Sequence, residues 1–152
     1  MANGTADFGS VEGFVREALA AQGFMRLVGA EVEEVVPGRC TLAVDFRPDL
    51  TQQNGFFHGG VVAFLFDNTT AAAAATAIKD PKTEAVLSAE YKLNILSPAR
   101  GPRLRCRAEV VKPGRTLIVV DARVYDMDRE GREKPVAIGL ATIARVALER
   151  VS

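Results

Sequence analysis

A long apolar segment in the middle of the chain constrains the fold more than any other feature. Residues 61–78 contain no Gly or Pro, and alanine fills positions 71–75, which gives the segment high helix propensity. Asp67 is the only formally charged side chain between positions 49 and 79. A helix that is apolar on nearly all sides lies inside a protein or a bilayer. The pattern predicts one helix over 60–79, enclosed by protein.

Apolar and polar residues alternate with a period of two on both sides of this helix, as is typical of half-buried strands. Residues 27–46 predict a hairpin with a turn at Pro37 and Gly38. Four further strands are expected at 85–95, 103–112, 115–126 and 136–147. Their short connections predict a four-stranded antiparallel meander. A curved antiparallel sheet wrapped around the apolar helix fits these elements and places the chain in the α+β class.

The chain is expected to form a single domain over 1–152, because no linker divides it and its length suits one core. Residues 1–9 are expected to be loose. Within 10–22 we expect a short amphipathic N-terminal helix with Ser10 as its N-cap. The N-terminus has no apolar run behind a basic start, which favours a cytoplasmic protein over a secreted one.

Charge and cysteine content exclude several partners and cofactors. Nineteen basic and nineteen acidic residues cancel, so no net field recruits nucleic acid or an anionic membrane. Cys40 and Cys106 are too few for a disulfide framework or a zinc site, and their apolar surroundings predict buried, reduced thiols. The apolar helix is long enough to cross a bilayer. The polar cluster 67–70 at its middle and the amphipathic strands argue against a membrane protein.

Asp67 is the first candidate for chemistry. An ionised, unpaired carboxylate costs several kcal/mol to bury, so this one must be hydrogen-bonded, paired or functional. One interpretation is an acid bonded to backbone or hydroxyl groups, or exposed at a subunit interface. The other is a reactive carboxylate.

His58, Gly59 and Gly60 precede the helix. Glycines let a ligand approach the backbone, and the first N–H groups of a helix lack internal partners and can hold an oxyanion. Gly60 and Asp67 lie on one side of the helix, about 10 Å apart along its axis. An acyl group laid along that face, or approached from a neighbouring subunit, could meet both a donor and a base or nucleophile. Alternatively, His58 caps the helix and the glycines form a tight turn.

The segment 52–60 reads Gln-Gln-Asn-Gly-Phe-Phe-His-Gly-Gly and is followed by Asp67 nine positions after His58. This pattern resembles the hotdog-fold thioesterases, most closely their PaaI-like branch. Residues 87–99 resemble the family's first strand after the helix, 112–115 its next hairpin and 137–142 its last strand. The resemblance covers about 25–147. It implies a hotdog fold and hydrolysis of an acyl-CoA thioester to a carboxylic acid and free CoA.

The resemblance also implies a role for each motif residue. Asp67 would attack the thioester carbonyl or activate water, and the N–H of Gly60 or its neighbour Gly59 would donate to the thioester oxygen. His58 would orient the loop or the thioester. Gln52 would hold the water or the carbonyl, and Ser88 would orient the water from the other subunit.

Substrate contacts follow from the same resemblance. Asn54 lies in the loop beside Gln52, and Phe57, with Phe56, could line an acyl or aryl pocket. Phosphates of CoA could be held at two strand connections, by Lys112, Gly114 and Arg115 at one and by Arg100 and Arg103 at the other. For each of these cations the alternative is a solvated surface charge.

The family implies a homo-oligomer, a dimer or a homotetramer built as a dimer of dimers, with sites at the subunit interface. It implies no cofactor or metal, since CoA enters as part of the substrate. Two alternatives remain. A hydratase or dehydratase on this fold is disfavoured because the only histidine lies nine residues before Asp67. A non-catalytic acyl-CoA-binding module is disfavoured because binding alone does not require a costly buried acid.

Overall fold

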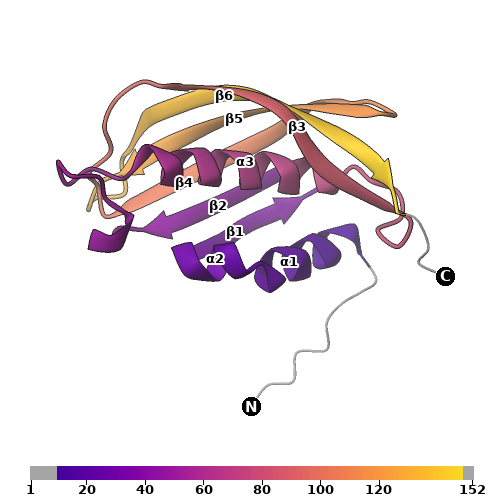
Figure 1. The fold of residues 1–152 in the computed structure, drawn as a ribbon, viewed down its shortest axis with the longest axis horizontal. Coiled ribbons are helices and arrows are strands. Elements are labelled where there is room, and N and C mark those ends of the chain that lie inside the picture. Colours follow the sequence, from indigo (N-terminus) through magenta and orange to yellow (C-terminus); the bar gives the residue numbers. More distant parts are fainter. Residues whose placement is uncertain (1–9, 149–152) are drawn as a thin grey trace, which may run out of the picture.

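The computed structural model describes residues 10–148, and the expected loose segment 1–9 lies outside them. Six antiparallel strands form one curved sheet in the order β1-β2-β4-β5-β6-β3, and the long helix α3 lies across its concave face (Figure 1). The predicted α+β architecture is therefore confirmed. The elements are α1 (Val11–Ala21), α2 (Gly23–Val28), β1 (Ala30–Val36), β2 (Arg39–Asp45), a 3-10 turn (Pro48–Leu50), α3 (Gly59–Ala75), β3 (Glu84–Ile95), β4 (Arg103–Pro113), β5 (Leu117–Met127) and β6 (Glu133–Ala147).

Helix α3 forms the centre of the core. Leu65, Phe66 and Thr69 are fully buried against the sheet, with Ala73 one turn further on. The helix stops four residues before the predicted end at 79, because the Thr76 hydroxyl turns the backbone: it donates to the carbonyl of Ala73 (2.7 Å) and accepts from the N–H of Gly38 (2.8 Å). One side of α3, which carries Asp67, is only half-buried, so a single chain does not enclose the helix as predicted.

Strand β3 is not the neighbour of β4, so the predicted four-stranded meander is wrong at its first connection. Only β4, β5 and β6 form a meander, and β3 pairs with β6 at the edge of the sheet. Residues 96–102 link β3 to β4, and seven extended residues reach about 23 Å, enough to pass the roughly 14 Å of three strand spacings. This link is fixed by hydrogen bonds from Phe57 N to Ala99 O (3.0 Å) and from Phe46 N to Pro102 O (2.8 Å).

The N-terminal part contains one helix more than predicted. Helix α1 begins as expected, with the Ser10 hydroxyl accepting from the N–H of Gly13 (3.1 Å). Gly23 does not end the helical region but starts α2, which closes at Gly29 in a left-handed conformation (φ 75°). The first strand therefore begins at Ala30 rather than at 27.

The convex face of the sheet carries ion pairs. Along β4 the side chains of Arg103, Arg105 and Arg107 point away from the core, while Leu104 and Cys106 point into it. These arginines bind carboxylates of β1, β2 and β6: Glu31, Glu33, Asp45 and Glu133. Arg103, proposed from the sequence to hold phosphate, is thus occupied by acids of its own chain.

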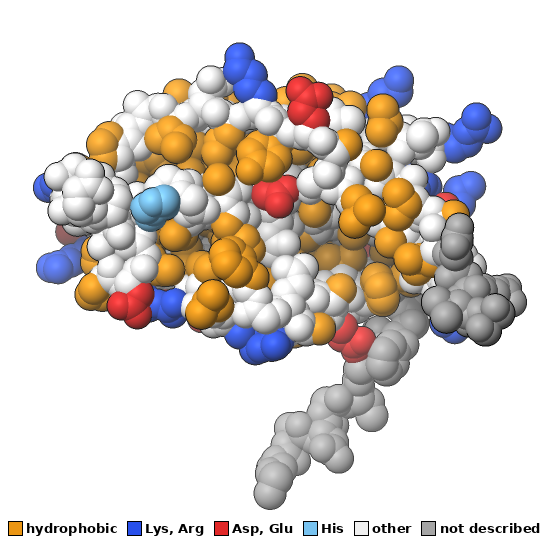
Figure 2. All heavy atoms as spheres, in the orientation of Figure 1, with side chains coloured by type: hydrophobic (Ala, Val, Ile, Leu, Met, Phe, Trp, Pro, Cys, Tyr) orange, Lys and Arg blue, Asp and Glu red, His pale blue; other side chains and the backbone are white. Residues whose placement is uncertain are grey.

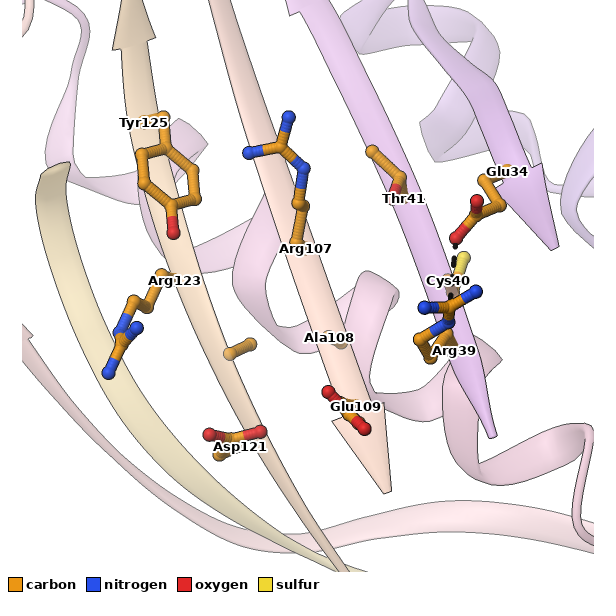
Figure 3. A pocket seen from close by; sticks show the side chains of 11 residues that line it. Glu34, Arg39, Cys40, Thr41, Arg107, Ala108, Glu109, Asp121, Arg123 and Tyr125 are labelled. Atoms are coloured by element: carbon orange, nitrogen blue, oxygen red, sulfur yellow. Dashed lines mark ion pairs between the residues drawn. The ribbon is translucent and has the colours of Figure 1, made fainter. Parts of the chain in front are cut away.

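Beside this network lies a polar depression of about 380 Å³ (Figure 3). Arg107, Arg123 and Tyr125 lie along it on β4 and β5, with Glu109 and Asp121 further down the same strands. The sheet separates this depression from α3. The two cysteines point the other way, into the core; both are buried and free, as predicted, and burial raises the pKa of each thiol to about 12.

Candidate active site

Asp67 lies in the middle of α3 and faces strand β3. The hydroxyl of Ser88 donates a hydrogen bond to its Oδ1 (2.7 Å). Within residues 10–148 no cation forms a salt bridge with Asp67, and Oδ2 has no hydrogen-bond partner. The carboxylate is therefore held by one oxygen and open at the other, as a base or a nucleophile requires. Ser88 was expected to act from the other subunit; here it contacts the Asp67 of its own chain.

The start of α3 separates the roles of the two glycines. His58 is the N-cap, and its Nδ1 accepts from the N–H of Gly60 (2.8 Å). The carbonyl of His58 accepts from the N–H groups of Val61 (2.9 Å) and Val62 (3.3 Å). In the described part of the chain the N–H of Gly59 has no such partner. Gly60 is thus occupied by the cap, and Gly59 offers the free donor.

Four residues proposed from the sequence line one depression at the start of α3. Gln52, Asn54, Phe57 and Gly59 line a depression of about 530 Å³ that Ile95 closes from β3. Within it, the side-chain oxygen of Gln52 accepts from the N–H of Asn54, so this oxygen already shapes the loop. The ring of Phe57 is buried and packs edge-on against Phe46, with centroids 5.2 Å apart.

A second depression, of about 510 Å³, lies on the other side of the helix start. Its apolar part includes Phe24 and Phe64, and its polar part is formed by Arg47, Asp49, Thr51, His58 and Gly60. The two rings contact edge-on, with centroids 4.7 Å apart. Figure 2 shows hydrophobic side chains gathered on this face around the single histidine. Sequence reasoning missed Phe24 because it did not predict α2; Gly29 after six helix-compatible residues was the available signal.

Gly59 and Asp67 are eight residues apart on one helix, which separates them by about 12 Å along its axis. A reacting carbonyl must lie about 3 Å from both its attacking group and its oxyanion donor. One chain therefore cannot supply both groups to the same carbonyl.

The cationic residues proposed for phosphate lie away from Asp67 in a single chain. Lys112 and Arg115 are exposed at the β4–β5 hairpin, three strand spacings from Ser88, or roughly 14 Å. Gly114 has a structural reason to be glycine, since a Cβ there would lie 2.1 Å from the carbonyl oxygen of Leu117. The guanidinium of Arg100 covers the ring of Phe56, 4.1 Å from its centroid.

Metal-ligating side chains do not gather into a group of three within residues 10–148. In the same part of the chain, every helix is too short or too polar to cross a membrane.

Comparisons with known proteins identify the family and the fold. The model of the thioesterase superfamily matches residues 54–132. A protein of Saccharolobus solfataricus, named as a proposed esterase, is 31% identical over 112 residues, which cover 74% of this chain and 73% of that protein. The structure of a thioesterase family protein from Silicibacter pomeroyi has a TM-score of 0.87 and 38% identity, and covers 91% of this chain and 100% of that one.

The PaaI protein of the Escherichia coli phenylacetic acid degradation operon has a TM-score of 0.75 and covers 90% of this chain and 96% of that one. At 16% identity it shows the fold alone. With these neighbours the sheet wrapped around α3 is identified as a hotdog fold. The family match covers the helix start, Asp67, Ser88 and the hairpin, and the chain belongs to the thioesterase superfamily.

Proposed function

We propose that the protein hydrolyses an acyl-CoA thioester to a carboxylic acid and free CoA. The observation that carries this proposal is the half-satisfied carboxylate: Ser88 fixes Oδ1 of Asp67 at 2.7 Å, and Oδ2 is open. Asp67 either takes a proton from the attacking water or attacks the carbonyl carbon itself. In both routes water supplies the new oxygen of the carboxylic acid, and the C–S bond breaks. The departing thiolate takes up the proton lost by the water and leaves as free CoA.

The N–H of Gly59 is the proposed oxyanion donor, in place of Gly60. It is the first amide of α3, at the positive end of the helix dipole. His58 contributes indirectly, because its Nδ1 fixes the turn through Gly60. A ring nitrogen that accepts a hydrogen bond carries no proton, so His58 presents Nε2–H to the adjoining depression.

The site is proposed to form between two copies of the chain, so that Gly59 of one protomer and Asp67 of the other meet at one carbonyl. The 12 Å spacing on a single helix requires this arrangement. The edge strand β3 suits it, since it has unpaired backbone groups and exposes Leu87, Tyr91 and Ile95. In such a dimer, Lys112 and Arg115 of one copy can contact the phosphates of a CoA that is bound mainly by the other copy.

Two other functions use the same fold. A non-catalytic acyl-CoA-binding module does not need the open oxygen of Asp67, and the position of the single histidine, nine residues before Asp67, disfavours a dehydratase. We therefore place both behind hydrolysis. No cofactor is required, because the acyl-CoA brings its own activated carbonyl.

The test is thiol release from a panel of acyl-CoA esters that varies chain length and ring type, followed with a thiol reagent. We expect turnover of aryl or medium-chain acyl-CoA. The matched control is a panel of oxygen esters with the same acyl groups, which have no thiol to release. Binding of acyl-CoA without any thiol release would overturn the hydrolase and support the binding module.

A further inference from the structure

A cavity of about 260 Å³ lies between α1, α3 and the beginning of β3, outside the contacts described above. Its walls are mostly apolar, with Phe14 and Leu19 from α1, Ala71 and Ala75 from α3, and Val86 from β3. Asp67 and Ser88 do not line it, but their chain neighbours do: Asn68 follows Asp67, and Val86 lies two residues before Ser88. We call it the α1–α3 cavity.

Three polar side chains line this cavity, Gln22, Asn68 and Glu84, and Asn68 is the one that follows Asp67 in the chain. Asn68 lines the cavity, and its buried Nδ2 has no hydrogen-bond partner in the described chain. Buried polar groups are almost always paired, and an unpaired one is costly, so an isolated donor points to a missing acceptor. Since Asn68 is one residue from Asp67, an acceptor for it would lie within a few bonds of the reacting carbonyl.

The dimensions of the cavity limit what fills it. From Asp67 to Ala75 the helix rises about 12 Å. An extended chain advances roughly 1.2 Å per bond, so about ten bonds span this length. An apolar cavity of about 150 Å³ holds benzene, so 260 Å³ accommodates some ten carbon atoms. The length and the volume agree on eight to ten carbons.

We propose that the α1–α3 cavity binds the acyl group of a medium-length thioester that carries an oxygen at carbon 3, and that Asn68 donates to this oxygen. The inference rests on the proposed hydrolysis and names its substrate class. The carbonyl lies at Asp67, carbon 3 lies two bonds further on beside Asn68, and the remaining chain follows α3 toward Ala75. Asn68 is then a specificity-determining residue.

The experiment compares octanoyl-CoA, 3-hydroxyoctanoyl-CoA and butanoyl-CoA. For the wild type we expect kcat/KM to favour 3-hydroxyoctanoyl-CoA over octanoyl-CoA by about tenfold, the effect of one buried hydrogen bond. Asn68→Leu abolishes this preference while octanoyl-CoA is still hydrolysed. Ala75→Leu fills the far end and lowers kcat/KM for octanoyl-CoA at least tenfold relative to butanoyl-CoA. Ala20→Leu makes the same change on the exposed side of α1 and leaves every ratio unchanged.

The outcomes separate this inference from the proposed function. The cavity assignment is overturned if Asn68→Leu keeps the preference for the hydroxylated substrate, or if Ala75→Leu keeps the chain-length profile of the wild type. In both cases the proposed thioester hydrolysis still stands. If Ala75→Leu does not fold, Ala71→Val tests the same wall. If the wild type releases no thiol at all, the proposed hydrolysis is wrong. The cavity assignment is then tested by measuring the binding of non-hydrolysable thioether analogues of the two octanoyl substrates. Tighter binding of the hydroxylated analogue, lost in Asn68→Leu, supports the cavity assignment, and equal binding overturns it.

Discussion

The two faces of the sheet use charge in opposite ways. On the convex face, Glu133 accepts from Arg107 (2.6 Å) and Arg105 (2.7 Å), and Glu33 accepts from Arg105 (3.1 Å) and Arg103 (3.2 Å). On the concave side, the Ser88 hydroxyl is the only side chain of residues 10–148 that hydrogen-bonds to the Asp67 carboxylate. A carboxylate whose oxygens are all matched by arginines is stabilised where it is and has no lone pair left for a reactant.

This difference distinguishes a structural carboxylate, Glu133, from the proposed reactive carboxylate, Asp67. Hydrogen bonds from Arg107 lower the pKa of Glu133 and outweigh its burial, and Glu133 is committed to the fold. Asp67 is supported by a neutral hydroxyl and keeps one oxygen open. Substitutions on the concave side should therefore change turnover and spare stability, and substitutions on the convex face should do the reverse.

The largest expected effect comes from Gly59. Proline has no N–H and is tolerated at the first position of a helix, and His58 already has the extended backbone that precedes proline (φ −61°, ψ 138°). Gly59→Pro should lower kcat about 100- to 1000-fold, as expected for loss of one oxyanion donor. Gly59→Ala is the matched control, because it keeps the N–H and its Cβ meets only Ile95 Cδ1 at 3.6 Å. Equal rates for the two variants would exclude this amide.

Asp67→Asn should lower kcat at least about 100-fold, because it removes the basic and nucleophilic oxygen. The midpoint of urea unfolding should change little, since Asp67 accepts only one described side-chain hydrogen bond. Steady-state rates and urea titration measure the two effects. Turnover like that of the wild type would remove Asp67 from the mechanism.

Ser88→Ala tests the positioning of the acid. We expect kcat to fall about tenfold with KM within twofold, because one hydrogen bond that orients Asp67 is lost and substrate contacts are retained. Ser88→Thr keeps the hydroxyl and should restore part of the rate. A loss in Ser88→Ala that Thr does not restore would indicate a packing role instead.

The sequence was sufficient for the parts of the fold that local patterns determine. The apolar run predicted α3, the period-two segments predicted all six strands, and Ser10 predicted the start of α1. The position of β3 was not predictable, because the length of 96–102 permits both a neighbouring and a distant strand. Helix α2 was missed because Gly23 is as compatible with a helix start as with a helix end.

The residues of the candidate site could be named from the sequence, but their hydrogen-bond partners could not. The motif located His58, Gly59, Gly60 and Asp67, yet only the cap geometry shows that the amide of Gly60 is used by His58. Likewise, Arg103 has the right charge for a phosphate, and only the sheet register brings it against Asp45. Contacts between distant strands decide which charges are free, and such contacts have no local signature.

The smallest expected effect lies on the convex face. Glu133→Gln should lower the free energy of unfolding by about 1 kcal/mol and leave kcat unchanged, since its ion pairs are partly exposed. Because the hydrogen bond from Arg107 holds the folded-state pKa of Glu133 below the ordinary pKa of a glutamate, the contribution of Glu133 is complete above that ordinary pKa and is lost as the pH falls through the folded-state pKa. Urea titrations of both proteins should therefore differ at pH 7 and converge once the pH falls below the lowered folded-state pKa of Glu133. A difference that persists in acid would show that Glu133 stabilises the sheet by packing rather than by charge.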